Sequence, residues 1–446
     1  MQYPHLGFSA LFKIRAAGCT DVDRRAKILT MPVRSTQTRM CRVNRQGAAA
    51  LPPGLRRSRR TVLDRAAPIR WEVEIKVPFA RPDVGLAEAE AVSAVILSGD
   101  LASGKTCTRF EERFAARFGA AHAVSVGSCT QGFLLLLSSL GVCGQKVLSP
   151  TYTFTGPAAM AAQVGARVAL LDNAPGSYAP GLADWASAGM GAKVAMPVHF
   201  AGQGLDLRAL RQVLPADCVI LDDAAHALST LVNGECVGNS GALATVFSFY
   251  ATKNLCTGNG GMILTEDADL ARELRKIRLH GFSRDLRERY SGGLSWDYSI
   301  EKIGWKCNLT DVAAAMGLVQ LDRLAAMQGR REWLARIYAA GLADVPGITC
   351  PGMDEGPGST NAWHLYPISL SPSLSRNDLH QYLRTREIDT SVHFIPLHQH
   401  PAWAGRGPFP HADRAFQGEL SLPMFSAMTD DQARYVVGCI RDYVER

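Results

Sequence analysis

The chain has 446 residues, a formal net charge of +7 at pH 7 and 47% hydrophobic residues, enough for one large or two to three ordinary domains. Residues 1–70 hold 13 Arg and 2 Lys against 3 Asp, a charge of +12, so residues 71–446 carry 7 − 12 = −5. This acidic balance argues against a nucleic-acid-binding face outside the N-terminal segment. The apolar runs are shorter than the roughly 20 residues of a membrane-spanning helix, so we expect a soluble, globular protein.

The 11 cysteines are scattered from Cys19 to Cys439, and none forms a C-x-x-C pair. This spacing favours neither a zinc site nor a disulfide framework. It predicts reduced thiols and a cytoplasmic protein without a structural metal.

The segment 1–75 differs from the rest in composition, since it is rich in Arg, with RRSRR at 56–60, and shows no sustained apolar period. Three interpretations remain open: a disordered tail, an organelle-targeting segment, or residues upstream of the true start, for which Met31 is one candidate. A secretory signal fits least, because no long apolar stretch is followed by a small-residue cleavage site.

From Val77 onward the apolar residues become regularly spaced. Helical spacing predicts helices over 87–97 and 108–118. Short β-type runs follow, most of them separated by helical stretches: AHAVSVGS (121–128), KVLSP (146–150), ARVALLD (166–172), KVAMPVHF (193–200) and CVILDD (218–223). This alternation predicts an α/β domain with a largely parallel sheet.

After Thr265 the pattern becomes helical, and the stretch at 309–342 is long enough to cross from one lobe to another. Beyond Pro346, apolar segments alternate with helices predicted at 375–386 and 430–444. We therefore expect an N-terminal extension over 1–75, a large domain over 76–325 and a smaller α+β C-terminal domain over 326–446.

Polar residues follow several of the predicted strands, at the sheet edge where α/β proteins collect ligands. GSCTQG (127–132) opens a helix, where free backbone N–H groups and the hydroxyls of Ser128 and Thr130 form either a phosphate cradle or an ordinary N-cap. Phe154, after the next strand, either stacks on a flat ring or belongs to the core.

Two further stretches carry an acid and a lysine. VILDDAAHA (219–227) ends in two carboxylates and a histidine, and an aspartate beneath a pyridinium nitrogen would strengthen such a ring as an electron sink. In FSFYATKNLCTGNGG (247–261), Ser248 precedes Lys253 by a short stretch, and the glycines that follow allow a sharp turn. A phosphate cradle, a stacking ring, an acid and a Schiff-base lysine together indicate pyridoxal phosphate, which needs that set.

From Val77 to the C-terminus the chain resembles the DegT family of pyridoxal-phosphate-dependent sugar aminotransferases, which have the fold type I architecture. Matching stretches lie in the family's order over all of the chain except the N-terminal extension, and include VPFARPDVG, GSCTQGFLLLL, DDAAHALST, FSFYATKN, WKCNLTDVAAAMGLVQLDRL and VHFIPLH. The resemblance implies a large domain with a mixed, mostly parallel sheet flanked by helices, and a smaller α+β C-terminal domain.

The resemblance also assigns roles to residues around the cofactor. Lys253 matches the lysine that holds pyridoxal 5'-phosphate as an internal aldimine and then acts as the acid/base. Asp223 matches the partner of the pyridine nitrogen, His226 the residue that binds the ring hydroxyl, and Phe154 the stacking ring. The phosphate-binding positions match Ser128, Cys129, Thr130 and Ser248.

Members of the family are homodimers in which the partner chain completes each active site, through a stretch that corresponds here to Trp305–Leu309. Lys306 stands where many members have an asparagine and is assigned to the cofactor phosphate. Asn308, together with His393 and His398 of VHFIPLH, is assigned to the sugar substrate. Two other departures are Cys129 in place of Gly or Ala and Asp222 in place of Glu.

The implied reaction is transfer of an amino group, with L-glutamate as donor, to a nucleotide-linked keto sugar for surface polysaccharide, lipopolysaccharide or antibiotic synthesis. Arg284, Arg287 and Arg289 either bind the phosphates of such an acceptor or belong to a solvated loop. Two alternatives remain open: amination of a cyclitol or other non-nucleotide ketone, and a regulatory relative without turnover. Lys253 argues against the dehydratase relatives, which have histidine at that position.

Overall fold

The computed structural model of the chain describes residues 75–446, except 239–240, 283–297 and 354. Residues 1–74 of the expected extension, and the candidate phosphate ligands Arg284, Arg287 and Arg289, lie outside the described residues. Within those described ranges, no helix is both long and apolar enough to span a bilayer.

A seven-stranded sheet with the order β1-β9-β8-β5-β4-β2-β3 forms the centre of the larger part of the fold. Its strands are β1 His122–Val126, β2 Lys146–Pro150, β3 Arg167–Leu171, β4 Ala192–Ala195, β5 Val219–Asp223, β8 Ala244–Ser248 and β9 Gly261–Thr265. The pairs from β8 to β3 are parallel, whereas β9 runs antiparallel to both β8 and β1. This mixed, mostly parallel sheet confirms the predicted fold class.

Helices cover both faces of the sheet, because successive strand residues point to opposite sides and both sides are apolar. Val246 and Ile263 pack with helices α3, α4 and α7, while their chain neighbours Phe247 and Met262 pack with α2 and α9. The helices of this part are α1 Leu86–Ser98, α2 Lys105–Phe118, α3 Cys129–Ser139, α4 Gly156–Gln163, α5 Leu182–Gly189, α6 Leu207–Val213, α7 Ala268–Ile277 and α9 Asp311–Leu342.

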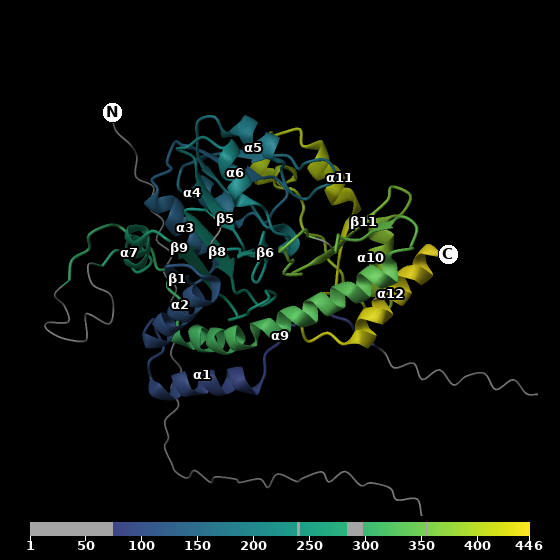
Figure 1. Cartoon of the computed structure of the whole chain (residues 1–446), viewed down its shortest axis with the longest axis horizontal. Helices are drawn as coiled ribbons and strands as arrows, with labels where there is room; N and C mark the ends of the chain where they lie inside the picture. Colours follow the sequence, from purple (N-terminus) through teal and green to yellow (C-terminus); the bar gives the residue numbers. More distant parts are fainter. Residues whose placement is uncertain (1–74, 239–240, 283–297, 354) are drawn as a thin grey trace, which may run out of the picture. The chain divides into compact units, whose positions relative to one another are not determined.

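A second, three-stranded antiparallel sheet lies in the C-terminal part of the chain. Its strands are β10 Ile348–Thr349, β11 Tyr366–Leu370 and β12 Glu419–Leu422, and its helices are α10 Arg376–Arg384, α11 Pro410–Gly418 and α12 Asp430–Val444. Helix α9 packs against α1 and α2 near one end and against α12 near the other (Figure 1). Because α9 runs unbroken through residue 325, the division there between two domains stays a prediction.

Candidate active site

Lys253 lies in the connection between β8 and β9, at the sheet edge where parallel strands end. Its Nζ is 3.3 Å from Nε2 of His364, which comes from the segment before β11. Burial lowers the pKa of Lys253 to about 8, against the opposing effect of the negative charge on Asp223. A lysine with this pKa has a substantial neutral fraction near pH 7 to 8, as a nucleophilic amine requires.

Asp223 ends the neighbouring strand β5 and is buried. Burial raises the pKa of its carboxyl to about 6, although the N–H of Ala225, which donates to Oδ1 at 3.0 Å, and the charge of Lys253 both oppose this shift. Asp222 is engaged elsewhere: Thr245 donates to its Oδ2 at 3.1 Å, and Nε2 of His199 lies 2.9 Å from its Oδ1. Asp223 is therefore the carboxylate that shares the Lys253 site.

His226 is buried shortly beyond Asp223, and its Nδ1 accepts the N–H of Ala201 at 3.2 Å. Burial lowers the pKa of His226 well below its ordinary value, so the neutral ring carries its proton on Nε2. The His226 and His364 rings are 4.4 Å apart between centroids. The structure therefore brings Asp223, His226 and Lys253 together.

The predicted phosphate cradle is the N-terminus of α3. Ser128 caps the helix by accepting the N–H of Gln131 at 3.1 Å, so the N-cap interpretation holds. The N-terminus of a helix is also its positive end, so the same place can bind an anion. A Cβ on Gly261, which pairs with Ser248, would lie 2.7 Å from the backbone nitrogen of Cys129, so β9 and the start of α3 are in direct contact. Because of this contact, Ser128, Cys129 and Ser248 lie close together.

Phe154 does not belong to the core, because it is 55% exposed. A Cβ on Gly156 would lie 2.8 Å from Oγ1 of Thr130 and 3.2 Å from the Phe154 ring, so both side chains border the same glycine. An exposed ring, a helix N-terminus, a buried acid and a lysine are the features that a pyridine ring with a phosphate and a reactive carbonyl needs. The residues present fit pyridoxal phosphate.

The two candidate substrate histidines differ in their surroundings. Burial lowers the pKa of His393 to about 4, and the charge of nearby Lys253 adds to this shift. His398 is engaged on both ring nitrogens, with Oγ1 of Thr151 at 2.8 Å and Oδ1 of Asp413 at 2.9 Å. His398 therefore ties two segments together and does not join the Lys253 group.

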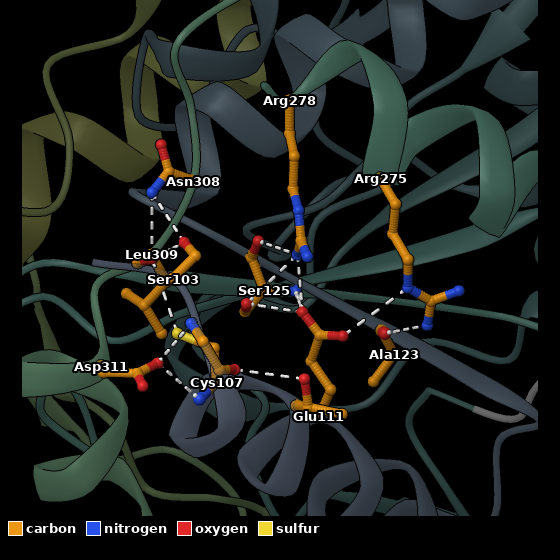
Figure 2. A network of polar contacts seen from close by, with 12 residues as sticks. Ser103, Cys107, Glu111, Ala123, Ser125, Arg275, Arg278, Asn308, Leu309 and Asp311 are labelled. Atoms are coloured by element: carbon orange, nitrogen blue, oxygen red, sulfur yellow. Dashed lines mark hydrogen bonds and ion pairs between the residues drawn. The ribbon is translucent and has the colours of Figure 1, made fainter. Parts of the chain in front are cut away.

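The segment with Lys306 and Asn308 lies beside the loop before α3, because Asn308 pairs with Val126 and the N–H of Gly127 donates to the Cys307 carbonyl at 2.8 Å. Asn308 donates to Oγ of Ser103 at 2.7 Å, and Asp311 accepts the N–H groups of Gly104 and Cys107 at 2.8 and 2.9 Å (Figure 2). These bonds fix the start of α9 against the N-terminus of α2. Lys306, just before this anchor, is exposed.

Sequence reasoning missed three buried polar residues around the site, namely His199, Asn254 and His364. His364 and Lys253 are 111 residues apart in the chain, so their contact has no local pattern. No strand-end pattern marks His364, because it precedes β11, whereas His226 follows β5.

Glu419 is a buried carboxyl beneath His393. Its Oε2 accepts the His393 N–H at 2.8 Å, and Ser421 Oγ lies 2.5 Å from its Oε1. Burial raises the pKa of Glu419 to about 8 despite these hydrogen bonds. The pKa of Glu419 is therefore higher in the folded than in the unfolded state. The contribution of its neutral carboxyl to the stability of the fold is fully present below about pH 4.5 and is lost as the pH rises through about 8.

We expect the melting temperature of the wild type to fall relative to Glu419→Gln between about pH 5 and pH 9. The glutamine amide reproduces the neutral acid, since its oxygen accepts the His393 N–H and its NH2 group donates to Ser421. Differential scanning calorimetry of both proteins across this range measures the effect. A constant difference at every pH contradicts the assigned ionisation.

Comparisons with known proteins agree with this site. The model of the DegT/DnrJ/EryC1/StrS aminotransferase family matches residues 82–441. The spore coat polysaccharide biosynthesis protein SpsC of Bacillus subtilis is 38% identical over 383 residues, which are 83% of this chain and 97% of SpsC.

Two solved structures have a similar fold. Spr1654 from Streptococcus pneumoniae, in its PLP form, is 27% identical with a TM-score of 0.77, covering 83% of this chain and 99% of that one. The sugar aminotransferase CalS13 from Micromonospora echinospora is 27% identical with a TM-score of 0.74, covering 82% of this chain and 99% of that one. The chain thus belongs to the DegT/DnrJ/EryC1/StrS aminotransferase family, and it is a pyridoxal-phosphate-dependent sugar aminotransferase.

Proposed function

We propose that this enzyme transfers the amino group of L-glutamate to the ketone of a nucleotide-linked keto sugar. The observation that carries the proposal is the group formed by Lys253 with the buried Asp223 and His226, in which the pKa of the amine is about 8. Bound pyridoxal phosphate supplies the electron sink that labilises the Cα–H bond of an amino donor.

The residues of the chain have separate tasks in this reaction. Lys253 binds the cofactor and, once its amine is free, holds and moves a proton at Nζ. Asp223 keeps the ring nitrogen protonated, and its burial strengthens that interaction. His226 donates from Nε2 to the ring oxygen. Phe154 covers the exposed ring face.

We assign an anion site and a sugar site to different residues around Lys253. We assign the phosphate to the N–H groups at the start of α3, to the hydroxyls of Ser128, Thr130 and Ser248, and to the backbone of Cys129. His393, whose ring stays neutral because its pKa is about 4, faces the acceptor sugar without adding charge. The printed role of SpsC supports a product used in polysaccharide synthesis.

We also propose a homodimer in which Lys306 and Asn308 reach the partner's site and Asn308 gives up its bond to Ser103. Support comes from apolar side chains exposed beside that segment, with Ile303 98% and Trp305 43% exposed. Sedimentation equilibrium should give twice the 48.2 kDa chain mass, and a monomer contradicts the proposal. The free cysteines of the described ranges are compatible with the cytoplasmic location that we propose.

The test is an absorbance spectrum of the reconstituted protein before and after addition of L-glutamate. We expect a visible band from the lysine-bound cofactor that shifts to shorter wavelength with glutamate. Lys253→Ala should lack the band, and Lys253→Arg, which keeps the charge, should lack it too. A band that persists in both variants contradicts the role of Lys253, and a band that ignores glutamate contradicts the donor.

A further inference from the structure

A chain of three polar side chains leads away from Lys253 into the core. Nζ of Lys253 contacts Nε2 of His364 at 3.3 Å, and Nδ1 of His364 contacts Oδ1 of Asn254 at 3.2 Å. Nδ2 of Asn254 lies 2.7 Å from the carbonyl oxygen of Ala362. His364 and Asn254 are both buried, so water does not compete for the two contacts that Asn254 makes.

The donor and the acceptor of each hydrogen bond in this series of side chains are fixed. A carbonyl oxygen can only accept, so the Ala362 contact fixes the Asn254 amide with its NH2 group toward Ala362. Oδ1 of Asn254 must then accept, and Nδ1 of His364 must carry the proton that is donated to it. Nε2 of a neutral His364 is left with a lone pair, which accepts an N–H from Lys253.

The His364 ring is also kept neutral and fixed in place. Burial lowers its pKa well below the ordinary value, and the charges of Lys253 and Arg331 act in the same direction. Its backbone N–H donates to the Ala201 carbonyl at 3.0 Å, and its own carbonyl accepts from Arg331 at 3.3 Å.

We propose that His364 is a positioning residue that orients the free amine of Lys253. An amine that donates one N–H to a fixed acceptor cannot rotate freely about its Cε–Nζ bond, so its lone pair points away from His364. This role rests on the proposed function, because Lys253 needs an oriented amine only if it binds the cofactor and moves a proton.

Two substitutions of His364 separate this role from a purely structural one. Glutamine places its amide where Nε2 stands, so H364Q keeps an acceptor for Lys253 and loses the contact with Asn254. Asparagine places its amide where Nδ1 stands, so H364N keeps the contact with Asn254 and loses the one with Lys253. The proposal predicts a defect in H364N that H364Q largely avoids, whereas a structural role predicts the reverse.

The first measurement needs no activity. The full-length protein is stripped of cofactor and labelled with trinitrobenzenesulfonate at a series of pH values, and the peptide with Lys253 is quantified by mass spectrometry. Loss of the acceptor destabilises the ammonium form, so the pKa of Lys253 should fall in H364N and stay near the wild-type value in H364Q. An unchanged pKa in H364N overturns the proposal.

The second measurement is the single-turnover rate with glutamate in the reconstituted enzyme. We expect H364N to be about 10- to 100-fold slower at saturating glutamate, with little change in the concentration needed for saturation. If the wild type itself shows no cofactor band, the proposed function fails, while the labelling result still reports on His364.

A third measurement covers the case in which H364N does not fold. Nitrogen-15 spectra of the histidine-labelled wild type, assigned with H364Q, show which ring nitrogen carries the proton. Protonation of Nδ1 alone from about pH 6 to pH 8 supports the proposal. A proton on Nε2 overturns it, because that nitrogen could then not accept from Lys253.

Discussion

Replacement of Asp223 by alanine is expected to slow the glutamate half-reaction by about 100- to 1,000-fold, the cost of removing one buried electrostatic partner of a developing charge. Asp223 lies at the end of β5 beside Lys253 and His226, and it is the acid of that group. The rate is measured by stopped-flow absorbance at saturating glutamate, so the identity of the acceptor sugar is not needed.

Asp222→Asn is the matched control for this prediction. Asp222 is equally buried but contacts Thr245 and His199, so its loss should lower the melting temperature and leave the half-reaction within a few-fold of the wild type. If Asp223→Ala stays within tenfold of the wild-type rate, or if Asp222→Asn is the slower enzyme, Asp223 does not have the assigned role.

Replacement of Arg331 by methionine is expected to destabilise the fold by about 3 kcal/mol, because buried acceptors lose their donor. Arg331 is buried in α9, and its NH1 lies 3.0, 3.3 and 3.2 Å from the carbonyl oxygens of Trp363, His364 and Met424. Burial lowers the pKa of Arg331 to about 10, so the group stays charged at neutral pH.

The neighbouring Arg330 provides the control. It pairs with Asp430 and donates to the Met428 carbonyl, but both side chains of the pair are partly exposed, so Arg330→Met should cost about 1 kcal/mol, less than Arg331→Met. The midpoints of urea unfolding, followed by circular dichroism, compare the two variants with the wild type. Equal midpoints for both variants contradict the view that Arg331 joins α9 to the segment that carries His364.

Elements with a clear period were predictable from the sequence. The run KVLSP became β2 with the same bounds, and the long stretch at 309–342 became α9. KVAMPVHF became a shorter strand, β4, because Pro197 has no N–H to donate to the ladder. The direction of β9 was not predictable, since an apolar strand reads alike in either direction.

Some residues of the candidate site were also predictable from the sequence, and others were not. Asp223, His226 and Lys253 could be found because each follows a strand of one sheet, and the carboxyl ends of parallel strands meet at one edge. His364 and Asn254 could not be found in that way, because their contact joins the connection after β8 to a segment 110 residues later. The departure at Cys129 concerns a side chain that is buried in the core, whereas a phosphate would bind the backbone N–H groups at a helix start.

Helix α9 fixes the distance between two of its contacts with other parts of the fold. Asp311, at its start, caps α2, and Arg331, several turns further along the same helix, holds the segment of His364. At roughly 1.5 Å and 100° per residue, these two residues are about 30 Å apart and lie on defined faces of the helix. A single inserted residue would rotate one of these two residues away from its partner, whereas many substitutions on the exposed side of the helix would not. Evolution can therefore vary the composition of α9 much more freely than its number of residues.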